Sequence, residues 1–316
     1  MSEDIALPLF GHKAPQEKFL KAMDGGRLHH AWIIEGPSGI GKSRFALRLA
    51  AMLLGAQPAA DSDRAGASAS DPVMQKVLSS GHPDLKHVQR AVGDNGKLKQ
   101  DIAVDQIREL NQFFSLKPAL GGWRIGILDS LDEMNANGRN AVLKTLEEPP
   151  PRAMLFLISH ATVPVLATIR SRCQSLRLTS LRKEETLAAL RAQQVESPEQ
   201  VADLVAGRPG RVEALTGQKV LAASHAARSF LKALPKPADA VLSTTIQAAA
   251  EDQASFGVFA EELLGWVSSK AEESPAWADV WFQLHNIVAS QRNLHMTPVQ
   301  AASKLVSTLQ TGAGKV

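Results

Sequence analysis

Eight residues, GPSGIGKS from Gly36 to Ser43, constrain what this chain can fold into more than any other stretch of its sequence. They follow the spacing Gly-x-x-x-x-Gly-Lys-Ser, in which glycines let backbone N–H groups turn inward around phosphate oxygens. An apolar stretch, AWIIE, precedes the motif, and RFALRLAAMLL follows it with the spacing of a helix. A buried strand, a tight loop and a helix N-terminus are the setting of a phosphate-binding loop. The alternative is a glycine-rich turn that matches by chance, and the flanking elements argue against it.

The motif predicts which residues would bind a nucleoside triphosphate. Lys42 would reach the β and γ phosphates, and the Ser43 hydroxyl would coordinate Mg²⁺. A second apolar stretch, RIGILD, ends in Asp129, which would position the same ion through its bound waters. We therefore expect ATP or ADP with Mg²⁺ as a possible cofactor, with Ser43 and Asp129 as the metal-binding residues. The loop residues expected to bind the nucleotide are Gly36, Pro37, Ser38, Gly39, Ile40, Gly41, Lys42 and Ser43.

The residue after Asp129 bears on whether such a site could hydrolyse what it binds. In nucleotide hydrolases with this loop the position usually carries the carboxylate that activates water, but here it is Ser130. A serine hydroxyl cannot act as a general base near neutral pH. Asp132 and Glu133 are near in sequence, but we expect them to point elsewhere and to complement the dipole of a helix start. The sequence therefore favours binding without hydrolysis.

The order of apolar and helical stretches predicts an α/β fold. Short strands that are apolar on both faces alternate with helical patterns, which favours a parallel sheet covered on both sides. The small, polar stretch between Ala56 and Ser80 shows no periodicity and is expected to be a flexible excursion at the sheet edge. The expected strands are AWIIE at 31–35, DLKHV at 84–88, RIGILD at 124–129, MLFLIS at 154–159 and SLRL at 175–178.

Strand signals end after Thr179, and the rest of the chain is helical in pattern. Two short helices are expected in LRKEETLAALRAQQ and SPEQVADLVAG, followed by amphipathic helices interrupted once by Pro235 and Pro237. Helices with wide apolar stripes need partners, which a bundle supplies. The predicted domains are a nucleotide-binding domain at 1–178, a small helical lid at 179–218 and a C-terminal helical bundle at 219–316.

Composition narrows the class of protein further. A single cysteine, Cys173, rules out an internal disulfide and a four-thiolate zinc site, and it fits a reducing compartment. No apolar run approaches the roughly 20 residues of a membrane helix, so we expect a soluble, cytoplasmic protein without membrane contact. The net charge of +3 does not by itself indicate nucleic-acid binding, and an aromatic content of 5% argues against a base-stacking surface.

Several stretches together resemble the clamp-loader branch of the AAA+ ATPases, which serves the bacterial DNA polymerase III holoenzyme. Two of them, AVLKTLEEPP and the SRC of TIRSRC, discriminate best, because clamp-loader subunits share them and most phosphate-loop proteins carry neither. The resemblance is close over about the first 180 residues and weakens through GRPGRVEAL. The matching stretches are GRLHHAWIIEGPSGIGKS, GHPDLKHV, IAVDQIRELNQFFSLKP, ILDSLDEMNANGRNAVLKTLEEPP and TIRSRC.

The resemblance implies roles for three further residues. Arg172 stands where these subunits carry an arginine finger, which crosses a subunit boundary to the γ-phosphate held by a neighbour. It ends VPVLATIRSR, a segment expected to be helical, and a surface salt bridge is the alternative role. Ser159 falls where the family places a polar residue that senses the γ-phosphate, although a helix cap explains it equally well. Arg211 lies one residue away from the place expected for a second sensor arginine.

The resemblance also implies partners. A subunit of this kind would help open a sliding clamp and place it on primed DNA, touching the DNA non-specifically. It would do so in a ring with tau/gamma motor subunits and a delta subunit, near the single-strand-binding, chi–psi side of the complex. Its helical C-terminal region would pack in a collar with the other subunits. The apolar stripe available for that contact, or for the bundle's own core, is Trp266, Trp277, Trp281 and Phe282.

Two features depart from related subunits. Many of them carry a four-cysteine zinc module between the loop helix and the next strand, whereas this interval holds no cysteine and one edge histidine, His82. Zinc is therefore not expected here. The phosphate loop is intact, although some related subunits lack it, so nucleotide binding stays possible.

Function can be stated as two hypotheses. In the first, the chain is a mostly non-hydrolysing ring subunit that supplies Arg172 to a neighbouring motor. In the second, it is an autonomous ATPase motor and needs another carboxylate to orient water, with Asp132 as the first suspect. A sequence-specific DNA binder finds little support, because scattered basic residues could touch phosphates only non-specifically. Those residues are Arg139, Lys144, Arg170 and Arg177.

Overall fold

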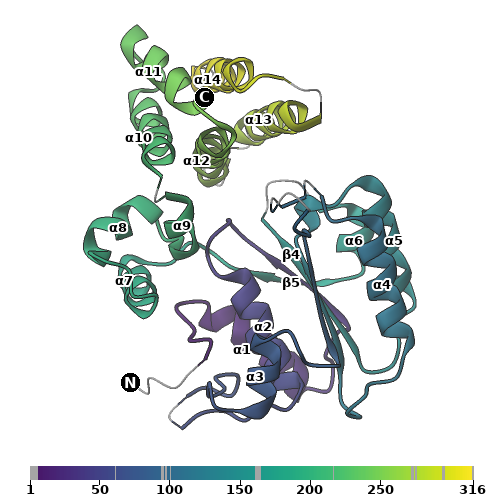
Figure 1. Ribbon diagram of the computed structural model, residues 1–316. Coiled ribbons are helices and arrows are strands. Elements are labelled where there is room, and N and C mark those ends of the chain that lie inside the picture. The colour runs from purple at the N-terminus through teal and green to yellow at the C-terminus, as the bar shows by residue number, and fades with distance from the viewer. Residues whose placement is uncertain are drawn as a thin grey trace. The chain divides into compact units, whose positions relative to one another are not determined.

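The computed structural model contains two compact units, Met1–Gly210 and Arg211–Val316 (Figure 1). The prediction of a separate lid between residues 179 and 218 remains a prediction, because the helices that it comprises fall partly in each unit. The structure describes residues 6–60, 62–93, 96, 98–99, 101–160, 165–215, 217–271, 274, 276–293 and 296–314.

Five parallel strands form one sheet in the first unit, in the order β2-β3-β4-β1-β5. Each strand lies within one residue of a predicted stretch, so the α/β fold class is confirmed. The predictions are most direct for β1, β3 and β4, which are buried on both faces and read as continuous apolar runs, whereas the edge strands β2 and β5 are partly exposed. Their bounds are Ala31–Glu35 for β1, Leu85–Gln89 for β2, Arg124–Asp129 for β3, Ala153–Ser159 for β4 and Gln174–Arg177 for β5.

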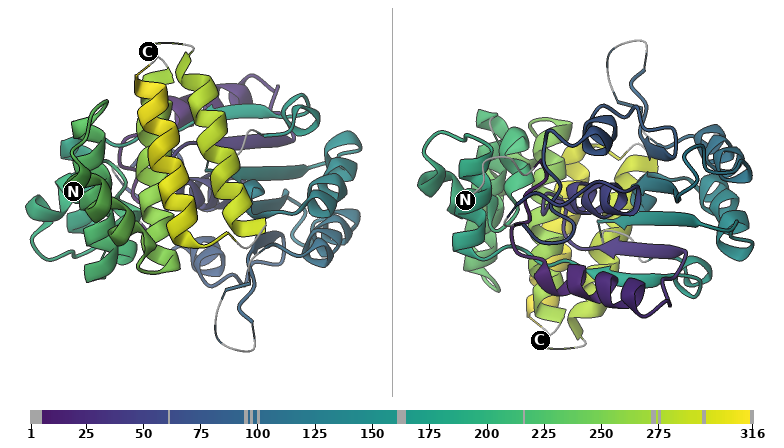
Figure 2. Two further views of the ribbon diagram at one scale, coloured as in Figure 1. Left: turned by 90° about the horizontal axis from the view of Figure 1, so that it is seen from above. Right: turned by 90° about the horizontal axis from the view of Figure 1, so that it is seen from below.

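Helices cover both faces of the sheet (Figures 1 and 2). Successive strand residues point to opposite faces, so Ile34 packs in one apolar cluster and Ile33 in the other. The first cluster includes Phe19 and Leu49, and the second includes Leu110 and Leu146. The helices that carry these side chains are α1 at Lys13–Asp24, α2 at Lys42–Leu53, α4 at Val104–Ser115 and α5 at Ala136–Glu147.

The stretch between Ala56 and Ser80 differs from the prediction of a flexible excursion. It contains helix α3 at Pro72–Leu78, whose N-terminus is capped by the Asp71 side chain, 2.8 Å from the Met74 backbone nitrogen. Upstream of α3, Pro58 pairs with Ala67 in an antiparallel bridge. The described part of this stretch is therefore folded onto the unit.

A buried arginine explains how that stretch is held. The Arg48 side chain, on α2, is 3% exposed and donates to Asp63 Oδ2 at 2.5 Å, to Gln16 Oε1 at 3.0 Å and to the Leu7 carbonyl at 2.5 Å. Burial would raise the pKa of Asp63, but the Arg48 guanidinium beside it outweighs this and lowers that pKa. Arg48 thus joins the N-terminal segment, α1 and the 56–71 segment through one charged group.

Short helices complete the first unit. They are the 3₁₀ turn η1 at Leu131–Glu133, α6 at Ala167–Arg170, α7 at Lys183–Ala192, α8 at Pro198–Val205 and the turn η2 at Pro209–Arg211, which crosses the unit boundary. The helical prediction for residues 163–172 is thereby corrected. Only the single turn α6 forms within its described part, and residues 163 and 164 lie outside the described residues.

The second unit is helical, as predicted. Its core includes Phe230, Phe259, Leu263 and Leu305, which are all fully buried. Trp277 belongs to this core and Trp266 and Trp281 pack against it, whereas Phe282 is 49% exposed. The intradomain alternative therefore holds for the three tryptophans of the predicted stripe. The helices are α9 at Val212–Leu215, α10 at Gln218–Ala233, α11 at Asp239–Ala250, α12 at Gln253–Ala271, α13 at Ala276–Asn293 and α14 at Pro298–Ala313.

Arg211 takes part in a buried charged cluster within this unit. Its Nη1 lies 2.8 Å from Glu262 Oε1, which also accepts from Arg228 Nη2 at 3.2 Å and from Ser224 Oγ at 3.1 Å. Glu261 lies 3.7 Å from Arg211 Nε. A buried guanidinium requires such partners. Arg211, which lies one residue from an expected sensor position, therefore belongs to the interior of the helical unit.

No helix among the described residues is both long and apolar enough to cross a membrane.

Candidate nucleotide-binding site

The carboxyl ends of the parallel strands lie at one edge of the sheet, where ligands of such folds bind. The GPSGIGKS loop follows β1, Asp129 ends β3, and His160 follows β4. Gly36 cannot be replaced by a larger residue without rearrangement, because its φ is 153° and an added Cβ would lie 2.2 Å from the Leu178 carbonyl oxygen. The loop thus passes close against the end of β5.

Lys42 is buried and holds the loop closed. Its Nζ donates to the carbonyl oxygens of Gly36 at 2.7 Å and Pro37 at 2.6 Å. The side chain therefore crosses the inside of the loop, where a phosphate group would meet its charge.

Ser43 and Asp129 are brought together as predicted by the motif. Ser43 Oγ donates to Asp129 Oδ2 at 2.5 Å, and His87 Nε2 lies 3.6 Å from the same oxygen. Burial alone would raise the pKa of Asp129, but the His87 and Ser43 side chains outweigh it and lower that pKa. Asp129 is therefore ionised at neutral pH. With the phosphate oxygens and waters, these two oxygens have the chemistry that Mg²⁺ prefers.

A cavity of about 450 Å³ opens beside the loop. Its lining combines backbone of the loop with charged side chains and with two apolar residues, Val92 and Leu98, that pair in an antiparallel bridge. The residues that line it are Ser38, Gly39, Gly41, Lys42, Ser43, Arg44, Gln89, Arg90, Val92, Leu98, Asp129, Glu133, His160 and Gly210.

Glu133 was expected to point away from this site, and the structure corrects that expectation. The side chain lines the cavity and pairs with Arg90, whose Nε lies 3.1 Å from Glu133 Oε2. The single 3₁₀ turn η1 explains the direction, because a turn of three residues rotates residue 133 to a different side than a regular helix start would. Asp132 is not among the lining residues; its Oδ2 accepts from the His160 backbone nitrogen at 2.7 Å. Ser130 is fully buried.

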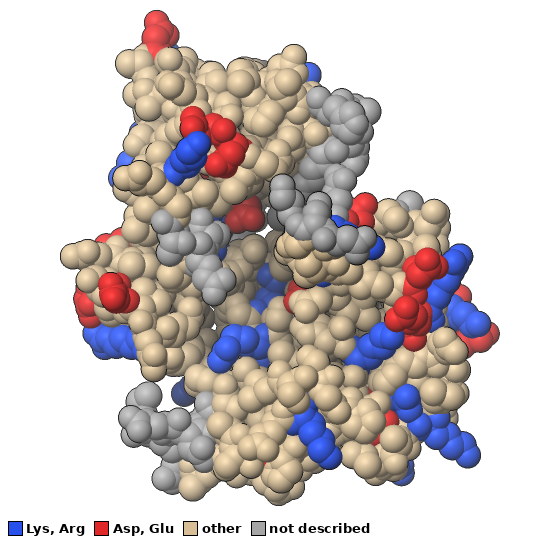
Figure 3. All heavy atoms as spheres, in the orientation of Figure 1, with Lys and Arg blue, Asp and Glu red and all other residues tan. Residues whose placement is uncertain are grey.

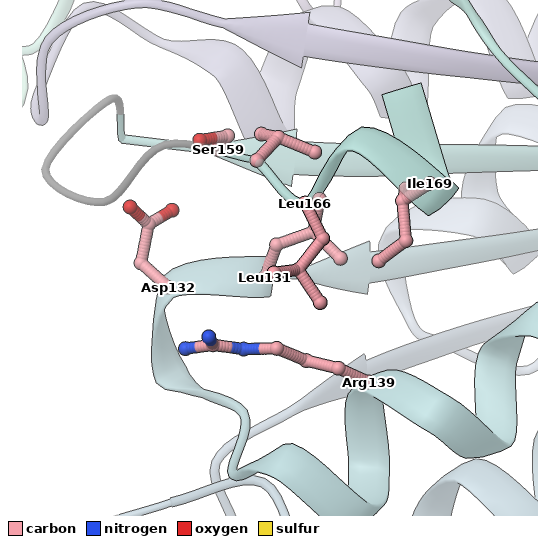
Figure 4. Close-up of a pocket in the computed structure, with 7 residues that line it drawn as sticks. Leu131, Asp132, Arg139, Ser159, Leu166 and Ile169 are labelled. Carbon is pink, nitrogen blue, oxygen red and sulfur yellow. The ribbon is translucent and has the colours of Figure 1, made fainter. Parts of the chain in front are cut away.

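Ser159 and His160 line two different cavities. Ser159 is 1% exposed and lines a separate cavity of about 10 Å³ with Leu131, Asp132 and Arg139, as Figure 4 shows. His160 lines the large cavity beside the loop. Its Nδ1 is buried and has no hydrogen-bond partner among the described residues. The sequence analysis did not identify His160 as a cavity residue. A signal was available in the alternation of β4, which places Ser159 on the same face as the core residues Leu155 and Leu157.

Burial and the nearby Lys42 charge lower the pKa of His160 to about 4. Its imidazole is therefore neutral at pH 7, with one ring nitrogen protonated.

Arg172 lies at the surface of the sheet unit, two residues after α6. The side chain is 37% exposed. Its Nη2 lies 3.0 Å from Glu147 Oε1 at the end of α5, and its Nη1 donates to the Thr168 carbonyl at 2.9 Å. The next residue, Cys173, is partly buried, and burial raises the pKa of its thiol to about 12.

Other basic residues have partners or lie dispersed. Arg170 Nη2 lies 3.0 Å from Glu35 Oε2, and Ser175 Oγ donates to the other carboxylate oxygen of Glu35. Burial would raise the pKa of Glu35, but the bonds from Arg170 and Ser175 outweigh it and lower that pKa. On the face shown in Figure 3, Lys and Arg side chains are dispersed, and several adjoin Asp or Glu. The pairing of Arg170 with Glu35 favours the alternative of ordinary surface charge for this residue.

A family profile described as "DNA polymerase III, delta subunit" matches residues 11–182. The chain belongs to this family. It is 37% identical over 212 residues to DNA polymerase III subunit delta' of Pseudomonas aeruginosa, a match that covers 65% of this chain and 62% of that protein. Over 159 residues it is 33% identical to the subunit delta' of Bacillus subtilis, with 49% and 44% covered. A match to DNA polymerase III subunit tau of Escherichia coli has 27% identity over 180 residues, with 56% and 26% covered.

The chain therefore spans less than two thirds of the length of these relatives. Within the described residues, no group of three or more His, Cys, Asp and Glu side chains could hold a metal ion.

Proposed function

We propose that this member of the family is a delta'-type subunit of the DNA polymerase III clamp loader, which helps load the sliding clamp onto primed DNA during replication. In the loader it supplies Arg172 to the nucleotide held by a neighbouring motor subunit. The observation that carries this proposal is the position of Arg172, partly exposed at the surface of the sheet unit and oriented by Glu147 and the Thr168 carbonyl. A guanidinium presented in this way can reach the γ-phosphate of an adjacent chain.

The chain's own site supports binding more than hydrolysis. The loop, Lys42, Ser43 and Asp129 converge on one cavity, which supports the proposal that ATP or ADP with Mg²⁺ binds there. When bound, Mg²⁺ would neutralise phosphate charge, with Ser43 and Asp129 on its protein side. Ser130 takes the place of the carboxylate that usually activates water, and it is fully buried. Nucleotide held without turnover would stabilise the folded unit by mass action.

The partners follow from the same proposal. The chain would join tau/gamma motor subunits and a delta subunit in the cytoplasm, near the chi–psi side of the complex, and would meet primed DNA through non-specific phosphate contacts. The matches to proteins named delta' and tau support membership of such an assembly.

Replacing Arg172 tests the proposal. In the reconstituted loader, Arg172→Ala should slow hydrolysis at the adjoining motor site by about a thousandfold, because a trans arginine stabilises charge that develops in the transition state. Total turnover would then fall by the share that this one site contributes. Nucleotide binding and assembly should be preserved. The readout is steady-state ATP hydrolysis with clamp and primed DNA.

Two variants serve as controls for this experiment. Arg191→Ala removes another exposed, ion-paired arginine of the same unit and should leave turnover unchanged. Arg172→Lys keeps the charge but loses the planar guanidinium, so activity should be only partly restored. Full turnover with Arg172→Ala in an intact assembly would contradict the proposal.

An autonomous ATPase motor is the second candidate, and the position of Glu133 favours it. This carboxylate lines the same cavity as Lys42 and Asp129, although it pairs with Arg90. If it orients water, the purified chain alone should hydrolyse ATP at a rate similar to the motor subunit, and Glu133→Gln should abolish that activity. A Lys42→Ala variant that left assembly hydrolysis and clamp loading unchanged would argue strongly against this candidate.

A further inference from the structure

His87 has a buried polar atom next to the Ser43–Asp129 pair. Its Nε2 has no hydrogen-bond partner among the described residues. Such atoms are rare inside folded proteins, because each unsatisfied one costs free energy. An acceptor lies close by, since Asp129 Oδ2 is 3.6 Å away, slightly beyond the range of a hydrogen bond. A small movement of either side chain would therefore satisfy this atom.

The parallel sheet places these two side chains on one face. His87 on β2 is in register with Ile127 on β3, and Asp129 lies two residues further along β3. Because side chains alternate along a strand, residues 127 and 129 point to the same face, where Ile127 packs in one cluster with Phe45 of α2. The side chains of His87 and Asp129 are each 16% exposed. Their separation is therefore set by the register of two paired strands.

Both contacts of Asp129 fall on one carboxylate oxygen. Ser43 Oγ, at the start of α2, donates to Oδ2 at 2.5 Å, and His87 Nε2 approaches the same atom from β2. Two contacts from different elements restrict the rotation of the carboxylate, and Oδ1 takes part in neither. That oxygen stays available to the waters of a bound Mg²⁺.

An apolar residue at position 87 would avoid the cost of burying Nε2. Leu85 and Ile127, on the same face of the sheet, are apolar and pack in the cluster beneath α2. The imidazole thus interrupts an apolar surface at the point where the carboxylate lies. Hydrogen bonds at functional sites are often long before a ligand binds and tighten in the complex. We therefore expect the contact of His87 with Asp129 to matter most when the site holds its ligand.

We propose that His87 is a positioning residue of the magnesium site. Its Nε2–H donates to Asp129 Oδ2 when a nucleotide and Mg²⁺ are bound, and this bond holds the carboxylate so that Oδ1 remains available to the ion. Replacing groups that orient metal-binding side chains typically weakens metal binding by about 10–100-fold. The inference rests on the nucleotide-binding part of the proposed function and is independent of Arg172.

Titration calorimetry on the full chain tests it, with ATP in excess EDTA and ATP in excess Mg²⁺ as the two probes. His87→Phe keeps an aromatic ring but removes the donor. It should weaken binding of Mg-ATP by about tenfold or more, while ATP affinity in EDTA stays unchanged. His87→Gln, whose side-chain amide can donate from a place similar to that of Nε2, should restore most of the Mg-ATP affinity.

A neighbouring residue on the same strand provides the matched control. Lys86 points to the other face of the sheet and pairs with the exposed Glu109. Lys86→Ala should therefore leave both affinities unchanged. Circular dichroism should show that every variant is folded.

The comparison of EDTA with Mg²⁺ separates a positioning role from a structural one. The inference is overturned if His87→Phe weakens binding equally under both conditions, if it leaves Mg-ATP binding unchanged, or if His87→Gln restores nothing. An unsubstituted chain that binds no ATP at millimolar concentration would overturn the nucleotide-binding part of the proposed function as well. None of these outcomes decides the Arg172 experiment, because that experiment reads hydrolysis at a neighbour's site.

Discussion

The acid–base behaviour of single residues at the sheet edge follows from how they are buried. His160 has a pKa of about 4 in the folded chain, below its ordinary value of 6.5. The unfolded chain therefore binds a proton more readily than the folded chain as the pH falls. The stability that His160 contributes is complete above about pH 6.5 and is lost progressively toward pH 4.

Unfolding in urea at pH 7 and pH 5 would measure this effect. Between these two values the folded chain should lose about 2 kcal/mol of unfolding free energy because of His160. His160→Asn should remove that part of the loss. His225→Asn, a substitution at an exposed histidine, is the matched control and should change little. Equal pH dependence of His160→Asn and the unsubstituted chain would show that the histidine is not held in its neutral form.

The loop, Lys42 and the Ser43–Asp129 pair could be predicted from sequence because their spacing is fixed by the phosphate that such loops bind. The observation that His160, and not Ser159, lines the large cavity could not be predicted. Which of the two faces the cavity depends on where β4 stops and on the bond from Asp132, and both are tertiary properties. Glu133 was misplaced for a similar reason, since a 3₁₀ turn rather than an α-helix follows β3.

At the scale of elements, close packing of α4 on β3 depends on Gly126. A Cβ at this position would lie 2.9 Å from Leu110 Cδ1 and 2.9 Å from Phe114 Cζ. Gly126→Ala should therefore destabilise the sheet unit by about 1–3 kcal/mol through overpacking. Gly122→Ala is the matched control, because nothing lies within 4 Å of its added Cβ. Urea unfolding followed by far-UV circular dichroism checks this, and equal stability of both variants would mean that α4 shifts freely.

The strands could be predicted more accurately than the stretch from Ala56 to Ser80, which lies between α2 and β2. Local apolar runs identify the central strands β1, β3 and β4. The stretch from Ala56 to Ser80 consists mostly of small and polar residues, and it is held by Arg48, which lies earlier in the sequence. One local signal was available: Asp71 followed by Pro72 is a helix start, and α3 begins there. The remainder of that stretch is held by long-range contacts, which periodicity does not report.

At the scale of the whole molecule, the two units have separate apolar cores, so their stabilities need not change together. Glu262→Ala would remove the carboxylate that accepts from Arg211, Arg228 and Ser224. Losing a buried partner of this kind typically costs about 3–5 kcal/mol. Hydrogen exchange read by mass spectrometry should show faster exchange in α10 and α12 and unchanged exchange in β1 and β4.

The neighbouring carboxylate provides the control for that prediction. Glu261 is 37% exposed and lies farther from Arg211, so Glu261→Ala should have a much smaller effect. Faster exchange throughout the sheet in the Glu262→Ala chain would mean that the two units unfold as one.

The raised pKa of the Cys173 thiol has a practical consequence. Maleimides and iodoacetamides attack the thiolate, and at pH 7 a thiol of pKa about 12 is almost wholly protonated. A cysteine introduced at an exposed site in each unit would therefore take up a fluorophore or spin label while the native thiol stays largely unmodified. The natural sequence can thus serve directly as the background for spectroscopic distance measurements during a loading cycle.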